Sequence, residues 1–377
     1  MTISIEVLKG IDSIKQIEEE WKALLSAERW FFFSHPGWYR VIWQTYYQRF
    51  TVYIILARSH GQLVGILPVC KGRMNKFGLY LPVVEVLGGR RSDYWTPVIK
   101  PGYEGVVFPL LLENMNNIKS LSGVIILPNL PEIKLEHKVV NDFVTSNSFS
   151  YVTEETSCPW FEFNSTYDEI EKNWSKKHRQ DLRRLGNKIS RDFGEVSLRV
   201  IKDKKEAVAF LPDFFKMHDK AWLARGVPGT FDDKCEQDKF KYIIENLWDD
   251  SVHFSQLFFG DKVVAYHFGF VWNESLLLYK PTYDVDFYKY SPGKIHIQYL
   301  VKEGLEKKWK IFDFLQGAEQ YKFFWAKQEM RTSTYLIKTK FISPSFFWLT
   351  RGRPFVQSKI GKIYLKIQTM IQKAKNE

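Results

Sequence analysis

Residues 288–296 combine the residue types of an anion-binding site. Ser291 suits a helix N-cap, Pro292 suits the first helical position, and Gly293 lets a ligand approach the backbone closely. Free N–H groups at a helix start attract anions, and Lys294 adds a positive charge. The simpler interpretation is an ordinary capped helix. The segment has neither the GxxxxGK[ST] pattern of a phosphate-binding loop nor the GxGxxG pattern of a dinucleotide site.

A second segment, residues 311–325, has the composition for acid–base chemistry. If residues 311–315 form a strand, Asp313 shares a face with Ile311 and Leu315, and its carboxylate lies in an apolar layer. Buried carboxylates have shifted pKa values, so Asp313 is a candidate general base, with a structural ion pair as the alternative. We expect the pKa of Asp313 to be raised unless a cation lies close to it.

Three further polar residues follow this expected strand. Glu319, Tyr321 and Lys322 come just beyond its end, where the active sites of open α/β sheets gather. Glu319 is the rival candidate for the general base.

Two other clusters are candidates for binding an acceptor. His218 and Trp222 lie four residues apart, so they share one helix face, and Arg225 follows them. A structural core role and an acceptor groove, in which the aromatic ring faces a sugar, are both open. Residues 176–191 hold seven Lys or Arg against one acid, which indicates either a solvated helix face or recognition of an acidic acceptor. No histidine spacing of the HExxH or HxH kind is present, so we predict no metal site.

The composition limits the class of protein. The chain has 377 residues, of which 45% are hydrophobic and 26% charged, which excludes a disordered chain, a collagen and a disulfide-stapled miniprotein. Its net charge of +11 favours anionic partners without choosing among them. The three cysteines form no CxxC pair, so we expect free thiols in a reducing compartment. With no leader-like or membrane-length apolar run in the sequence, we expect a cytoplasmic protein.

The expected elements repeat along the chain. Residues 51–58 with 63–71, and 253–259 with 263–272, each read as a β-hairpin with a Gly-containing turn. A strand, a loop, a helix and a strand follow each hairpin in the same order. A duplicated α/β unit is therefore the expected architecture. Further helices are expected at residues 105–117, 167–192, 205–224, 238–248 and 292–309, and strands at 123–130, 276–282 and 310–315.

This order of elements resembles the GNAT-type acyltransferases. It is most similar to the group of cellulose-biosynthesis acetyltransferases (CelD-type), which is related to the FemAB peptidyltransferases. The strongest likeness lies in residues 170–325, with the Ser291-Pro292-Gly293 helix followed by residues 312–317 and Lys322. Further matching positions are Trp38, Gly61, Val64, Gly65, Pro68, Ser92, Asp93, Tyr94, Trp174, Arg183, Arg184, His218, Trp222, Gly226 and Phe231.

The resemblance implies an α/β (α+β) fold of two tandem GNAT-like domains, each with a mixed, mostly antiparallel sheet flanked by helices. Residues 1–150 would form a domain without a donor site, and residues 151–340 the catalytic domain. Residues 341–377 form a basic amphipathic tail, for which docking on the domain surface and peripheral attachment to an anionic membrane are both open.

The resemblance also implies an acyl-CoA donor, with acetyl-CoA the simplest choice. Residues 291–294 (Ser291, Pro292, Gly293, Lys294) stand where GNAT enzymes place a Q/RxxGxG/A loop, and Lys322 would help to bind the donor. Because these residues depart from the GNAT pattern, a bulkier acyl carrier is an alternative donor. Tyr321 would protonate the leaving thiolate, and backbone N–H groups near residues 279–282 would polarise the thioester carbonyl. Arg183 and Arg184 would bind the acceptor together with His218, Trp222 and Arg225.

We therefore expect an N- or O-acyltransferase that acts on a sugar or a sugar-containing intermediate of polysaccharide or cell-envelope biosynthesis. The second hypothesis is a FemAB-like transferase that uses aminoacyl-tRNA, because the basic surface suits RNA. The third is a non-catalytic GNAT-like accessory protein of polysaccharide synthesis.

Overall fold

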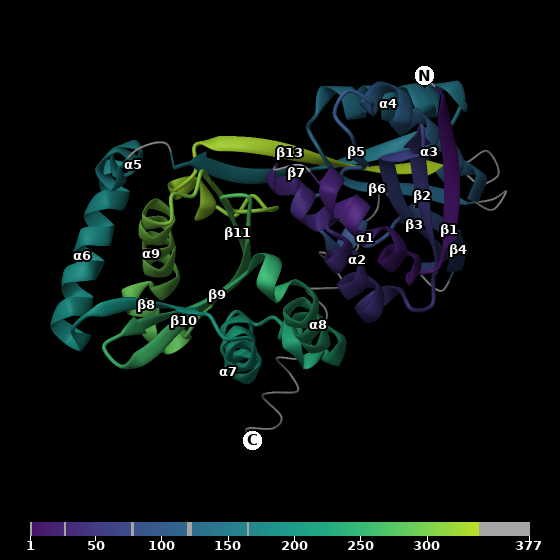
Figure 1. The fold of residues 1–377 in the computed structure, drawn as a ribbon. Coiled ribbons are helices and arrows are strands. Elements are labelled where there is room, and N and C mark those ends of the chain that lie inside the picture. Colours follow the sequence, from purple (N-terminus) through teal and green to yellow (C-terminus); the bar gives the residue numbers. More distant parts are fainter. Residues whose placement is uncertain (1, 26–27, 77–78, 119–122, 164–165, 339–377) are drawn as a thin grey trace.

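The computed structural model describes residues 2–25, 28–76, 79–118, 123–163 and 166–338. The basic tail expected at residues 341–377 lies outside them. In the described part of the chain, thirteen strands form one mixed sheet, in the order β1-β2-β3-β4-β6-β13-β7-β12-β11-β10-β9-β8, with β5 paired to β3. Helices cover both faces of this sheet (Figure 1). The α/β fold class is confirmed, but the two halves share one continuous sheet.

The first half contains six strands and four α-helices within its described residues. They are β1 (Ile3–Lys9), α1 (Ser13–Leu24), α2 (Pro36–Ile42), β2 (Thr51–Ser59), β3 (Gln62–Lys76), β4 (Leu79–Val86), β5 (Val98–Ile99), α3 (Glu104–Ile118), β6 (Val124–Pro131) and α4 (Lys134–Ser146).

The second half begins with a long strand that the sequence analysis did not predict. Its elements are β7 (Ser150–Glu162), α5 (Tyr167–Asn173), α6 (Lys176–Phe193), β8 (Val196–Ile201), α7 (Lys204–Leu223), α8 (Lys234–Ser251), β9 (Val252–Phe259), β10 (Lys262–Trp272), β11 (Ser275–Tyr283), α9 (Pro292–Glu306), β12 (Ile311–Asp313) and β13 (Gln328–Lys338).

The duplication is visible in the topology. In the first half, β2, β3 and β4 are antiparallel neighbours, and α3 then leads to β6, which pairs parallel to β4. In the second half, β9, β10 and β11 are antiparallel neighbours, and α9 leads to β12, which pairs parallel to β11. Both predicted hairpins are confirmed.

One expected helix is corrected by the structure. The single helix expected at residues 167–192 is two helices, because Trp174 is extended and the Ser175 hydroxyl caps α6 by accepting the His178 N–H at 3.2 Å. The expected division near residue 150 does coincide with the start of β7. However, β13 from the end of the second half pairs with β6 of the first as well as with β7, so β7 and β13 run as a pair between the two lobes (Figure 1).

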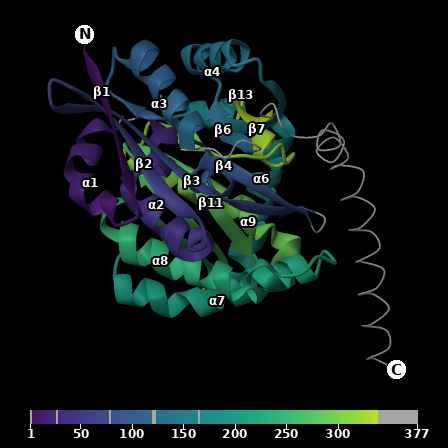
Figure 2. The same cartoon turned by 90° about the vertical axis from the view of Figure 1, so that its right-hand side faces the viewer.

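The hydrophobic core also joins the halves. One face of the sheet is covered by α1, α2, α7 and α8, whose aromatic side chains form a single buried cluster that includes Trp38, Phe214 and Phe240. At the α2–α8 contact, a Cβ on Gly37 would lie 2.8 Å from the Leu247 side chain, so this close packing requires glycine. The opposite face is covered by α3 and α4 in the first half and by α5, α6 and α9 in the second. Figure 2 shows α7 and α8 side by side below α2.

Candidate active site

The sheet opens between β11 and β12. These two strands pair in parallel only as far as Leu277 opposite Asp313, although β11 continues to Tyr283. On its other edge β11 carries a bulge, because Leu278 and Tyr279 lie opposite the single residue Gly269 of β10. The bulge and the end of the pairing occur at the same place, which directs backbone groups of β11 into the opening.

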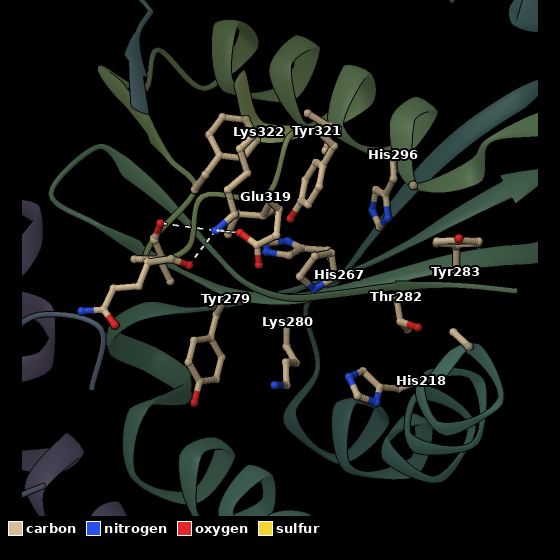
Figure 3. Close-up of a pocket in the computed structure, with 18 of the residues that line it drawn as sticks. His218, His267, Tyr279, Lys280, Thr282, Tyr283, His296, Glu319, Tyr321 and Lys322 are labelled. Carbon is tan, nitrogen blue, oxygen red and sulfur yellow. Dashed lines mark hydrogen bonds and ion pairs between the residues drawn. The ribbon is translucent and has the colours of Figure 1, made fainter. Parts of the chain in front are cut away.

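A cavity of about 910 Å³ occupies this opening and is lined from both halves of the chain. The first half contributes Arg90, Arg91, Ser92, Asp93 and Asn129. The two sides of β11 differ in Figure 3, where Tyr279, Lys280, Thr282 and His218 lie on the α7 side and His296, Glu319, Tyr321 and Lys322 on the α9 side.

The start of α9 forms one end of the cavity, with Ser291, Gly293 and Lys294 among the lining residues. The predicted helix start at Pro292 is confirmed. Ser291 occupies the N-cap position, but it has a left-handed φ of +48° and its side chain makes no capping hydrogen bond. A Cβ on Gly293 would lie 3.3 Å from the Tyr283 ring, so the absence of a side chain keeps this space open. Lys294 forms an ion pair with Asp181 of α6 at 2.6 Å.

Glu319, Tyr321 and Lys322 lie beside this helix start and line the same cavity. Lys322 is only 4% exposed, and its ammonium donates to the Gln316 carbonyl at 2.6 Å and pairs with Glu319 at 2.9 Å (Figure 3). Glu319 is therefore placed to hold Lys322 in position. The structure brings these three residues together, as the sequence spacing predicted.

Asp313 does not line the cavity. Its side chain is fully buried, the Arg29 guanidinium contacts it at 2.5 Å, and the Tyr94 hydroxyl and the Leu315 N–H donate to it at 2.9 and 2.7 Å. Burial raises its pKa, and Arg29 opposes that effect. This placement supports the ion-pair alternative rather than the general-base role, because the carboxylate is buried and its oxygens are taken up by Arg29, Tyr94 and the Leu315 N–H.

A different carboxylate, Asp93, lines the cavity from the first half. Its Oδ1 accepts the Gln316 N–H at 3.3 Å. Burial raises the pKa of Asp93 to about 6, with the Gln316 N–H and Lys322 acting in the opposite direction. In the sequence Asp93 stands out only as one position of the family resemblance, because nothing in its local spacing indicates that it meets the second half.

His218, Trp222 and Arg225 all line the α7 side of the cavity. The Trp222 indole N–H donates to Nε2 of His218 at 3.0 Å, so the His218 proton resides on Nδ1, which faces Asp219 at 3.3 Å. Burial lowers the pKa of His218 to about 4. This imidazole is therefore neutral and fixed at pH 7, which suits positioning of an acceptor more than proton transfer.

Arg183 and Arg184 are not brought to the cavity. They lie on the exposed face of α6, paired with Glu171 at 3.0 Å and Asp181 at 2.8 Å. The reason is the helix register, because the buried face of α6 is formed by His178, Leu182, Leu185 and Ile189.

The described residues contain neither a cluster of metal-binding side chains nor a membrane-spanning helix. Within them, no group of three or more His, Cys, Asp or Glu side chains could hold a metal ion. Every helix in the described ranges is too short or too polar to cross a lipid bilayer.

Comparison with known protein families identifies the region that contains α9 and β12. Residues 176–323, which contain α9, β12 and Lys322, match the family model described as an acetyltransferase (GNAT) domain. This part of the chain has a GNAT-type fold. A comparison with curated proteins found no match.

Two solved structures share the fold over most of the chain. The crystal structure of FemX has a TM-score of 0.57 at 10% sequence identity, covering 86% of this chain and 96% of FemX. A conserved protein of unknown function from Bacteroides thetaiotaomicron VPI-5482 has a TM-score of 0.54 at 10% identity, covering 89% of this chain and all of that protein. At these identities the likeness shows the fold alone, and the GNAT domain supports a transferase.

Proposed function

We propose that this protein transfers an acyl group from an acyl-CoA donor to an amine or hydroxyl of a sugar-containing acceptor. The observation that carries this proposal is the opening between β11 and β12, which has the start of α9 on one side and, on the α7 side of β11, a chamber lined by His218, Trp222 and Arg225. The matched GNAT domain supports an acyl donor. A role in polysaccharide or cell-envelope synthesis rests on the resemblance to the CelD-type group.

The donor fits the α9 side of β11. The N–H groups at the start of α9 and the Lys294 ammonium would bind the phosphates of the donor. The space beside Gly293 would let these phosphates come close to the backbone. The bound donor would supply the acyl group as an activated thioester.

The residues of the chain would then perform three tasks. Lys322 and the backbone N–H groups of the β11 bulge would stabilise the negative charge that grows on the carbonyl oxygen. Asp93 would accept the proton of the attacking amine or hydroxyl, for which a pKa of about 6 is well suited. The Tyr321 hydroxyl would return a proton to the departing sulfur. Glu319 would hold Lys322 rather than act as the base.

An acyl-transfer assay tests the proposal. The protein is incubated with acetyl-, propionyl- and succinyl-CoA and a panel of amino sugars, and the release of free thiol is measured. We expect acceptor-dependent thiol release with at least one donor. Folded protein that neither binds nor consumes any acyl-CoA in calorimetry and this assay would exclude acyl-CoA as the donor.

The FemAB-like reading, in which aminoacyl-tRNA is the donor, is favoured by one observation. The exposed face of α6 carries Arg183, Arg184 and Arg191, and α6 contacts the start of α9 through the Asp181–Lys294 pair. The fold likeness to FemX agrees with this reading but does not select the donor. Retention of tRNA in a filter-binding assay, falling steeply with salt, would favour it. The accessory-protein reading predicts full biological function in a variant whose donor site is blocked.

A further inference from the structure

The chamber on the α7 side of β11 has more positive than negative charge. The described side chains that line the whole cavity include seven Lys or Arg and three Asp or Glu. Most of the cations on the α7 side are matched by acids, since Lys239 pairs with Glu236 at 2.7 Å and Arg91 lies 3.8 Å from the same carboxylate. Two of the described cations there have no acid within ion-pair distance: Arg225, which donates to the Tyr283 hydroxyl at 3.4 Å, and Lys280.

Lys280 forms no hydrogen bond or ion pair with any described residue. It follows the bulge of β11 directly, and its side chain lies on the same side of the strand as Tyr279, Thr282 and His218 (Figure 3). The two carboxylates whose charge reaches Lys280, Glu236 and Asp93, make their hydrogen bonds elsewhere, to Lys239 and to the Gln316 N–H. Lys280 is therefore a cation that lines the cavity without a carboxylate in direct contact with it among the described residues.

A second ammonium raises the free-energy cost of keeping the Lys280 charge partly buried. Lys239, 7% exposed, lines the same chamber from α8. Burial and the charge of Lys239 lower the pKa of Lys280, and the carboxylates of Glu236 and Asp93 act in the opposite direction without cancelling that effect. An unpaired ammonium in a partly desolvated site destabilises the protein unless a ligand brings negative charge to it.

We propose that the acceptor carries a carboxylate or phosphate, which Lys280 binds, with the charges of Lys239 and Arg91 lining the same cavity. This inference rests on the proposed function. Since Lys280 adjoins the bulge that would polarise the acyl group, the anionic group lies close to the amine or hydroxyl that is acylated. The acceptor class is thus a sugar acid or a sugar phosphate rather than a neutral sugar.

Calorimetric titrations with matched probes test this inference. D-Glucosamine 6-phosphate is compared with D-glucosamine, and D-glucuronate with D-glucose, so that each pair differs in one anionic group. Saturating coenzyme A is present, because it occupies the α9 side and prevents the probes from binding there. We expect the anionic member of at least one pair to bind the wild-type protein at least about 10-fold more tightly than its neutral partner.

The Lys280→Gln variant supplies the decisive comparison. It should weaken binding of the anionic probe about 10- to 100-fold, as expected for loss of one charged hydrogen bond, while leaving the affinity for coenzyme A unchanged. Its melting temperature without ligand should be higher than that of the wild type, because an unpaired charge is removed. Lys216→Gln, on the exposed face of α7, is the matched control and should change neither property.

Three results would overturn the inference. They are equal binding of the anionic probe to the wild-type and Lys280→Gln proteins, binding that appears only when coenzyme A is omitted, and no preference for either anionic probe. If coenzyme A itself does not bind the folded protein, the proposed function fails instead. The titrations without coenzyme A then still decide whether Lys280 binds an anion.

Discussion

At the scale of single residues, the structure favours Asp93 over Asp313 as the general base of the proposed reaction, because Asp93 lines the cavity and Asp313 is buried in an ion pair. Asp313 lies on a strand inside an apolar layer, which is where a perturbed carboxylate is expected. However, its partners Arg29 and Tyr94 come from 284 and 219 residues away in the sequence, so no local pattern predicts that pairing. Asp93 reaches the cavity only because the two halves pack together.

The Asp313→Asn variant should therefore be unstable but active. Removal of one partner from a buried ion pair leaves the Arg29 charge uncompensated, and should lower the free energy of unfolding by about 3–5 kcal/mol. Turnover per folded molecule should stay near the wild-type value. Denaturant unfolding and an activity assay on the folded fraction measure the two effects. Glu155→Gln, which breaks an exposed pair with Arg331, is the control and should cost less than about 1 kcal/mol. A stable but inactive Asp313→Asn protein would restore Asp313 as the base.

Asp93 should control the pH dependence of the reaction. A general base works only as the carboxylate, and the pKa of Asp93 is about 6, so kcat/KM should fall as the pH falls through about 6 and level off above it. Asp93→Asn should reduce turnover by about 10²-fold or more and remove this acidic limb. Asp142→Asn, on the exposed surface of α4, should keep the wild-type profile. An unchanged profile in Asp93→Asn would assign the base to another residue.

At the scale of elements, the start of α9 is the feature on which donor binding depends. Gly293→Trp places a large ring against Tyr283 and into the cavity, so it should abolish acyl-CoA binding while the fold is retained. The duplication offers a matched control. Gly105 is the second residue of α3, as Gly293 is of α9, and a Cβ there meets nothing within 4 Å. Gly105→Trp should bind acyl-CoA like the wild type in calorimetry. Unchanged binding in Gly293→Trp would place the donor elsewhere.

The same elements show what the sequence can predict. The hairpins carry their own turn residues and α9 has Pro292 at its first position, so their places followed from local chemistry. β13 has no such signal, because its partners β6 and β7 lie about two hundred residues earlier in the chain, and it was not predicted. The cluster of Glu319, Tyr321 and Lys322 was predictable because three neighbours on one loop meet in any fold. The contribution of Asp93 and Arg91 to the cavity was not predictable, because it depends on how the two halves pack together.

At the scale of the whole molecule, the shared sheet should make the halves depend on each other. A fragment of residues 1–149 would leave β6 without β13, exposing an apolar strand edge along Val124–Pro131. We expect this fragment to aggregate or to lack a cooperative unfolding transition, whereas the full chain unfolds as one unit. Adding residues 328–338 to the fragment through a flexible linker should restore solubility, as judged by circular dichroism and gel filtration. A fragment that folds alone would show two independent domains.

The central claim is that one acyl-CoA molecule binds on the α9 side of β11 in the second half. Native mass spectrometry of the full chain mixed with acetyl-, propionyl- or succinyl-CoA measures this directly. The account predicts one bound donor per chain in the wild-type protein and none in Gly293→Trp. Two bound donors per chain would contradict a single site in the second half, and folded wild-type protein with no adduct from any donor would contradict the claim itself.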